Sequence, residues 1–174
     1  MIISYMKHTV YISIGSNLND RVQNCAIAIS KLTMFASLLK QSSFYETEPW
    51  GYEDDNLYIN AVLKIQTELN PQKLLIQLKL IEKEMGRLKK TTNNIYASRV
   101  IDLDILFFDQ IILNSTNLTI PHIQVHNRNH VLIPFNEIDP EFECPLKKDQ
   151  IQNLVKLSND KTKVFIYPQQ IVNK

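Results

Sequence analysis

The chain has 174 residues, of which 44% are hydrophobic and 21% are charged, and its formal net charge is +1. This composition is typical of a globular protein with a well-packed core, and the near-neutral charge excludes a broadly basic nucleic-acid-binding surface. No apolar run is long enough to span a bilayer, so we expect neither a membrane nor a nucleic acid as a partner.

The first predicted elements are a strand and a helix. Residues 9–15 alternate in polarity and are rich in β-branched side chains, which predicts a strand. Asn19 or Asp20 can cap a helix over about residues 21–35. The apolar stripe expected for this helix consists of Val22, Cys25, Ala26, Ala28, Ile29 and Leu32.

Two further strands follow, with a long loop between them. Residues 38–45 and residues 58–67 have the composition of strands. Residues 46–57 contain a proline, a glycine and five acidic side chains, which predicts a loop. Loops of this length inside a compact domain are often functional.

A second helix and a fourth strand complete the first part of the chain. Asn70 is a predicted N-cap before Pro71, and the helix runs to about Met85 and stops at Gly86. Its inner face is expected to consist of Leu74, Leu75, Leu78, Ile81 and Met85. A polar and basic loop over residues 86–98 leads to a strand within residues 99–108.

This order is β-α-β-β-α-β, the ferredoxin-like arrangement of the α+β class, in which helices cover an antiparallel sheet. The C-terminal additions are a short hairpin strand over residues 111–113, an extended segment over residues 118–122 and a helical turn over residues 128–135. The last predicted elements are a helix over residues 149–157 and a strand over residues 163–167.

Cysteine spacing and the N-terminus bear on the domain organisation and the cellular setting. We expect one domain over residues 1–174, with an N-terminal extension over residues 1–8 and an alternative start at Met6. The extension lacks a secretory h-region, and Cys25 and Cys144 match no zinc or redox spacing. We therefore expect a reducing, cytoplasmic setting, and we expect a monomer.

Two aspartates stand inside the predicted fourth strand. Strand side chains alternate, so Asp102 and Asp104 share a face, with Cα atoms roughly 6.5–7 Å apart. Aspartate is depleted in strands, and Mg²⁺ commonly binds through one or two carboxylates together with substrate phosphates. The pattern therefore indicates a metal site, although an exposed strand face that carries two acids is the alternative.

Basic side chains lie close to this acid pair in the sequence. Arginine grips phosphate oxygens in a bidentate manner, whereas lysine acts as a point charge. The only glycines are Gly15, Gly51 and Gly86, too widely spaced for a Walker A loop or a dinucleotide fingerprint, so side chains would have to hold a nucleotide. The alternative is a solvated loop end plus a structural ion pair. The basic set is Arg87, Lys89, Lys90, Arg99, His122 and Arg128.

Aromatic and amide side chains form a third group. Tyr58 and Asn60 share one face of a predicted strand, and Trp50 lies in the preceding loop. An aromatic plane beside an amide suits a flat heterocycle with hydrogen-bonding edges, although ordinary packing is the alternative. His122, His126 and His130 recur every four residues, but Pro121 makes a continuous metal-binding helix unfavourable.

Several segments together resemble one enzyme family, the 6-hydroxymethyl-7,8-dihydropterin pyrophosphokinases of folate biosynthesis. The run from Arg99 to Phe108, which reads R-V-I-D-L-D-I-L-F-F, is followed by Pro121-His122 and is the most specific match. The other matching segments are Tyr11 to Leu18, Ser42 to Thr47, Tyr58 to Ala61, Ile81-Glu82 with Gly86-Arg87, and Asn127-Arg128.

The resemblance implies a fold, a reaction and roles for individual residues. The fold would be an α/β/α sandwich on a ferredoxin-like core, and the reaction would be transfer of the β,γ-pyrophosphoryl unit of ATP to the pterin hydroxymethyl oxygen, with release of AMP. Two Mg²⁺ ions would be held by Asp102 and Asp104, and Asp102 is the nearest, though weak, candidate for a general base. Arg87 and Arg99 would assist the transfer. ATP would lie against Glu82, Lys89, Arg99, Ile105, Thr119, His122 and Arg128, and the pterin against Thr47, Glu48, Trp50, Tyr58, Asn60, Tyr96 and His130.

The chain departs from the family pattern at several of these positions. His130 stands where the family usually has an aromatic side chain that stacks on the pterin, and Tyr96 stands where tryptophan is common. Lys89 often appears as arginine, and Asn117 lies where a basic residue can occur. A non-catalytic ferredoxin-like binding domain is therefore the competing hypothesis, whereas an RNA-binding ferredoxin-like module is disfavoured because its stacking motif is missing.

Overall fold

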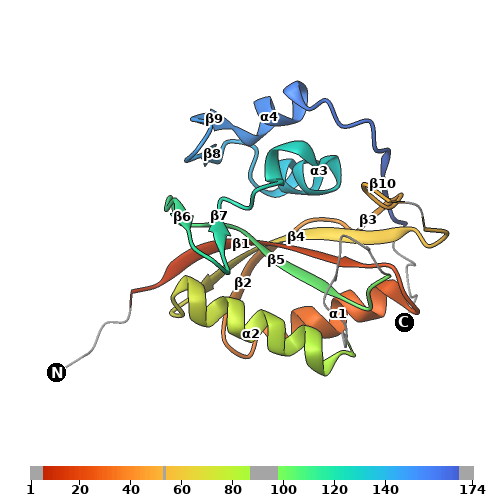
Figure 1. Ribbon diagram of the computed structural model, residues 1–174, viewed down its shortest axis with the longest axis horizontal. Helices are drawn as coiled ribbons and strands as arrows, with labels where there is room; N and C mark the ends of the chain where they lie inside the picture. The colour runs from red at the N-terminus through yellow and green to blue at the C-terminus, as the bar shows by residue number, and fades with distance from the viewer. Residues whose placement is uncertain (1–5, 53, 87–97, 169–174) are drawn as a thin grey trace.

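An antiparallel sheet runs between two layers of helices (Figure 1). The structure is a computed structural model and describes residues 6–52, 54–86 and 98–168. The helices α1 (Arg21–Leu32) and α2 (Pro71–Glu84) cover one face of the sheet, and α3 (Asn129–Ile138) and α4 (Ile151–Leu157) lie over the other (Figure 1). The predicted α/β/α layering is therefore confirmed. None of the helices in the described part of the chain is long and apolar enough to cross a membrane.

The sheet has the strand order of a ferredoxin-like core. Its centre is β1 (His8–Ser16), which pairs antiparallel with β4 (Tyr58–Thr67) on one side and β5 (Asp102–Phe108) on the other. The strands β2 (Ser37–Gln41) and β3 (Tyr45–Thr47) both pair with β4. This arrangement matches the β-α-β-β-α-β prediction, because the two strands that flank each helix lie in one sheet with one strand between them: β4 separates β1 from β2, and β1 separates β4 from β5.

The C-terminal part adds small elements to this core. Two-stranded sheets form from β6 (Leu113–Asn114) with β7 (Thr119–Ile120), and from β8 (Glu143–Cys144) with β9 (Asp149–Gln150). A 3₁₀ turn, η1 (Val125–Asn127), precedes α3. The last strand, β10 (Val164–Ile166), pairs with β3 and extends the main sheet. The predicted C-terminal hairpin and helix additions are therefore present.

Polar caps define the ends of the first two helices. Asp20 accepts a hydrogen bond from the Gln23 amide at 3.0 Å, and Asn70 accepts one from the Lys73 amide at 2.9 Å. Gly86 follows α2 with a φ of +95°, a conformation that glycine adopts at little cost. These caps confirm Asp20, Asn70 and Gly86 as the local signals that were read from the sequence.

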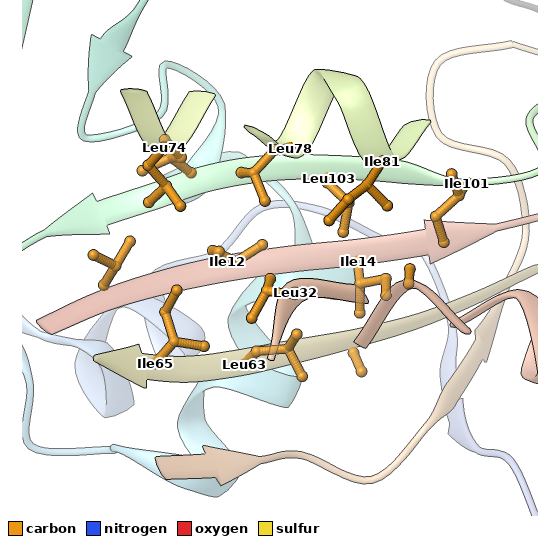
Figure 2. Packing of buried hydrophobic residues seen from close by; sticks show 14 of the residues in the cluster. Ile12, Ile14, Leu32, Leu63, Ile65, Leu74, Leu78, Ile81, Ile101 and Leu103 are labelled. Carbon is orange, nitrogen blue, oxygen red and sulfur yellow. The ribbon is translucent and has the colours of Figure 1, made fainter. Parts of the chain in front are cut away.

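Two apolar cores stabilise the sandwich, one on each face of the sheet. Figure 2 shows the larger one, in which Ile12 and Ile14 of β1 pack with Leu78 and Ile81 of α2. The second core joins Tyr11 and Phe107 of the sheet to Phe135 of α3. Cys25 and Cys144, one in each core, are both free and buried.

Some element boundaries differ from the predictions. The second predicted strand is split into β2 and β3, because the Ser42 hydroxyl and amide both bond the backbone of Val62 and interrupt the regular pairing. The predicted loop over residues 46–57 consequently loses its first two residues to β3. The predicted turn at residues 128–135 is a ten-residue helix, stabilised by its buried apolar face. Ala26 is exposed, because the buried stripe of α1 runs through Cys25, Ala28 and Leu32.

Candidate active site

The acid pair lies on the face of β5 that looks toward α3. Ile101, Leu103 and Ile105 point the other way and are buried in the core beneath α1 and α2, as the alternation predicts. Asp102 and Asp104 are both half-buried. The two carboxylates are thus held by a strand whose opposite face is anchored in the larger core.

Cations accompany each carboxylate. Arg99 Nη1 lies 2.5 Å from Asp102 Oδ2, and Lys79 Nζ lies 3.9 Å from Asp104 Oδ1. Burial disfavours the charge on Arg99, but the negative charges of Asp102 and Asp104, the hydrogen bond to Asp102 and the nearby Tyr58 together outweigh it and hold the pKa of Arg99 above its ordinary value. Arg99 is therefore a permanent cation beside the acid pair.

A pocket opens over these carboxylates between the sheet and the start of α3. It has an empty volume of about 680 Å³, part of which is open to solvent. Ten residues predicted for the site come together in its lining. They are Thr47, Glu48, Trp50, Tyr58, Asn60, Arg99, Asp102, Asp104, Arg128 and His130.

One wall of the pocket comes from β4. Asn60 is buried and donates from Nδ2 to Thr47 Oγ1 at 2.9 Å, which fixes the orientation of its amide. The hydroxyls of Tyr58 and Tyr52 lie 2.6 Å apart, and burial raises the pKa of Tyr58, so its ring is neutral at physiological pH. Gly15 faces this wall, and a Cβ there would lie 3.0 Å from Asn60 Oδ1. The wall therefore presents an aromatic plane beside a fixed amide.

The opposite wall is the start of α3. The Arg128 guanidinium lies 4.7 Å from the centre of the Trp50 ring, a cation–π arrangement. His130 lines the pocket beside it, and burial together with the charge of Arg128 lowers the pKa of His130 to about 4. His130 is consequently a neutral ring at physiological pH, which allows it to stack against a flat ligand.

Four residues predicted to line a nucleotide site lie outside the pocket lining. Glu82 is buried on α2 and accepts a hydrogen bond from the Leu103 amide at 2.8 Å, so it holds the β5 backbone. Ile105 is part of the larger core, and Thr119 is exposed on β7. His122 is half-buried, and its burial lowers its pKa while the charge of Asp104 opposes this effect. Their predicted contacts with ATP stay predictions.

Three further predicted residues, Arg87, Lys89 and Tyr96, lie outside the described residues. The structure also brings five residues into the lining that sequence reasoning did not single out as site residues. Gly15 and its neighbours do belong to a segment that carries the family resemblance, so that segment held a usable signal. The five residues are Ser13, Ile14, Gly15, Tyr52 and Val131.

The metal predictions can be compared with the donor set that the structure places together. His126 belongs to η1 and His130 to α3, so the histidines at intervals of four do not share one helix. Within the described ranges, no three His, Cys, Asp or Glu side chains gather as a metal cage. Two carboxylates on one strand face nevertheless fit Mg²⁺, which often takes only one or two protein carboxylates and completes its shell with phosphate and water.

Comparison with known proteins agrees with this arrangement. The sequence model described as 7,8-dihydro-6-hydroxymethylpterin-pyrophosphokinase (HPPK) matches residues 11–140. The chain belongs to the HPPK family. A Haemophilus influenzae protein named 2-amino-4-hydroxy-6-hydroxymethyldihydropteridine pyrophosphokinase is 39% identical over 162 residues, which cover 92% of this chain and 99% of that protein.

Longer proteins contain a similar unit. The chain is 43% identical over 138 residues to the Pneumocystis carinii folic acid synthesis protein fol1, and the match covers 79% of this chain but only 18% of that protein. A crystal structure of a Plasmodium falciparum HPPK-DHPS triple mutant superposes with a TM-score of 0.72 at 17% identity, covering 90% of this chain and 45% of that one. At that identity the superposition supports the HPPK fold, which is the ferredoxin-like fold described above.

Proposed function

We propose that this chain is an ATP-dependent pyrophosphokinase that transfers the β,γ-diphosphate of ATP to 6-hydroxymethyl-7,8-dihydropterin, releases AMP and so serves tetrahydrofolate biosynthesis. The observation that carries the proposal is the pocket itself. It places an acid pair and two arginines beside an aromatic and amide wall. Membership of the HPPK family supports the reaction class.

The wall formed by β4 suits the pterin. A pterin is a flat heterocycle with hydrogen-bond donors and acceptors along its edge, and Asn60 offers an amide whose orientation is set by Thr47. Tyr58 and His130 supply two neutral rings for stacking on its faces. The pterin would therefore bind between β4 and the start of α3, with its hydroxymethyl group toward the acid pair.

The cations suit the triphosphate. Arg99 and Arg128 both line the pocket, and each guanidinium can grip two phosphate oxygens at once. In the proposed step the pterin hydroxymethyl oxygen attacks the β-phosphorus in line and releases its proton to solvent, while the bond from that phosphorus to the α,β-bridging oxygen breaks and AMP leaves with that oxygen. The arginines neutralise charge on the transferred group, and alignment of the two substrates supplies much of the acceleration.

Asp102 and Asp104 are the residues that would hold Mg²⁺ with the ATP phosphates. The metal, when bound, would contribute Lewis-acid stabilisation of the phosphate charge. The chain's own contribution is to keep both carboxylates on one rigid face, because the other face of β5 is buried in the core. Dependence of turnover on Mg²⁺, and its loss on addition of EDTA, would test this assignment.

The decisive experiment measures AMP release by liquid chromatography in the presence of ATP, Mg²⁺ and 6-hydroxymethyl-7,8-dihydropterin. AMP that appears only when the pterin is present is the expected result. Release of ADP would indicate ordinary phosphoryl transfer and contradict the proposed reaction. Absence of any product would favour the non-catalytic ferredoxin-like binding domain instead.

We also propose that the protein works as a monomer in the cytoplasm. Two buried free thiols fit a reducing compartment, where disulfides are rare. Light scattering coupled to size-exclusion chromatography should give a mass near 20.3 kDa. A mass of twice that value at micromolar concentration would contradict the monomer, and fractionation of the source cells would test the location.

A further inference from the structure

The helix α3 is capped by a residue from much later in the chain. The residue at its own N-cap position, Arg128, makes no side-chain capping bond. Instead, Asp160 Oδ2 accepts a hydrogen bond from the Asn129 amide at 2.7 Å, and Asn129 Nδ2 donates to the Asp160 carbonyl at 2.8 Å. Two hydrogen bonds thus connect the first turn of α3 to the segment that follows α4.

Asp160 is itself held firmly in that segment. Its Oδ1 accepts hydrogen bonds from the amide and the hydroxyl of Thr162, at 2.9 and 2.7 Å. Burial opposes the charge, but the hydrogen bonds from the Asn129 amide and from Thr162, with a smaller contribution from His130, together outweigh it and hold the pKa of Asp160 below its ordinary value. An ionised carboxylate is also favoured at the positive end of a helix dipole. The hydrogen bond from Asn129 to Asp160 is therefore charge-assisted, and Thr162 fixes the other oxygen of the same carboxylate.

The same segment also reaches the other side of the pocket. Beyond Thr162 the chain forms β10, which pairs with β3 so that Val164 lies opposite Thr47, a lining residue. The Tyr167 amide then donates to the Phe44 carbonyl at 2.7 Å. Residues 158–167 thus contact both α3 and β3, and they lie beyond residues 11–140, which the family model matches.

The bonded residue Asn129 lies directly between two residues of the site. Arg128 stacks on Trp50, and His130 lines the pocket. We infer that Asp160 is a positioning residue of this enzyme: by holding the Asn129 backbone, it keeps Arg128 against Trp50 and His130 against the pterin. The substrate part of this inference rests on the proposed function, whereas the geometric part does not.

Trp50 gives a direct readout of the geometric part, because it is the only tryptophan in the chain. Asp160→Ala should change the emission maximum of Trp50 and at least double its quenching by acrylamide, since the Arg128 guanidinium would leave the ring. The matched control is Asn70→Ala, which removes the N-cap of α2. It should lower the melting temperature by a similar amount and leave the Trp50 emission unchanged.

Kinetics give the second readout. Asp160→Ala should raise the KM for the pterin by about three- to tenfold. This is the effect expected from losing the charge-assisted hydrogen bond between the Asn129 amide and Asp160, which orients the start of α3. Asn70→Ala should leave that KM within about twofold of the wild-type value. If Asp160→Ala proves too unstable, Asp160→Asn keeps one acceptor oxygen and should show the same changes at smaller amplitude.

The outcomes separate this inference from the proposed function. Unchanged Trp50 quenching in Asp160→Ala, or an equal change in Asn70→Ala, would overturn the inference while wild-type AMP release still stood. A change in Trp50 without a change in the pterin KM would reduce Asp160 to a structural cap and also overturn it. If the wild type released no AMP, the proposed function would fail, and the Trp50 comparison would still decide whether Asp160 positions Arg128.

Discussion

Asn17 and Arg99 exchange two hydrogen bonds although they are far apart in the sequence. The Asn17 amide donates to the Arg99 carbonyl at 3.1 Å, and the Arg99 amide donates to Asn17 Oδ1 at 2.6 Å. Asn17 is buried, and its Nδ2 also donates to Asp54 Oδ2 at 3.2 Å. One asparagine therefore joins the end of β1, the loop before β4 and the backbone of the arginine that pairs with Asp102.

Replacement of this asparagine should impair the reaction through Arg99. Asn17→Ala removes both side-chain bonds, so the Arg99 guanidinium loses its fixed position, and kcat should fall on the order of 10- to 100-fold because alignment is lost. The comparison is with Asn153→Ala, which removes a half-buried asparagine on α4 that bonds Asp149. Steady-state kinetics in which both variants retain wild-type kcat would contradict the role of Asn17.

The acid pair should be needed for turnover but not for folding. Asp102→Ala and Asp104→Ala should each reduce AMP release by roughly 100-fold or more, because the Mg²⁺ proposed to bind with the ATP phosphates would lose a carboxylate ligand. Both variants should still unfold cooperatively in denaturant, with the larger loss of stability in Asp102→Ala, because that change removes the carboxylate that pairs with the mostly buried Arg99. Glu143→Gln, at an exposed position on β8, serves as the control. Near-normal turnover in both alanine variants would remove the basis of the proposed reaction.

A methyl group at Gly15 should disturb the β4 wall of the pocket, where the pterin is proposed to bind. The added Cβ would lie 3.0 Å from Asn60 Oδ1, so the amide would have to shift and weaken its bond to Thr47. Gly15→Ala should raise the KM for the pterin about three- to tenfold and leave the KM for ATP nearly unchanged. Initial-rate measurements with each substrate varied in turn would check this, and equal increases in both KM values would contradict it.

His130 should make stability depend on pH. Its pKa is about 4 in the folded protein and 6.5 in the unfolded reference, with burial and Arg128 as the main causes. The unfolded chain therefore binds more protons between pH 6.5 and 4, so stability falls as the pH is lowered through that window, by on the order of 3 kcal/mol. Asp160 opposes the shift through its negative charge.

His130→Phe tests this dependence, because phenylalanine does not titrate. Urea unfolding at pH 7.5 and pH 4.5 should show a smaller difference in unfolding free energy for His130→Phe than for the wild type. A residual difference is expected, because burial also lowers the pKa values of His122 and His126. The same variant should lower the KM for the pterin, since a phenyl ring stacks better than imidazole. If both proteins showed the same pH dependence of the unfolding free energy, the lowered pKa of folded His130 would be contradicted.

The candidate site was only partly predictable from the sequence. Asp102 and Asp104 could be placed on one face, because strand alternation is a local rule that spans two residues. Gly15 and Tyr52 were not singled out as lining residues: Gly15 lies in a segment that carries the family resemblance but has no side chain to suggest a contact, and Tyr52 carries neither a charge nor a motif. The role of Asp160 could not be predicted either. Its capping partner Asn129 is 31 residues away in the sequence, and nothing in the sequence distinguishes Asp160 from an ordinary loop aspartate.

Two boundary errors have equally specific causes. A continuous strand was predicted across Ser42, but the hydroxyl of that serine takes the place of a backbone acceptor for Val62. A short helical turn was predicted over residues 128–135, but α3 runs from Asn129 to Ile138 with Pro134 inside it. The burial of Leu132 and Phe135 in the second core stabilises the helix in spite of the proline.

Four features could be read from the sequence alone: the order of the elements, the buried face of β5, the helix caps at Asn70 and at Asn19 or Asp20, and the family. These features depend on periodicity, on hydrogen bonds within one turn and on residue runs, all of which are written over a few neighbouring positions. The folded chain was needed to learn that Gly15, Asn60, Asp102 and His130 line one pocket, and that Asp160 caps α3. Such contacts join residues from distant segments, and they exist only once the sheet and the two cores have brought those segments together.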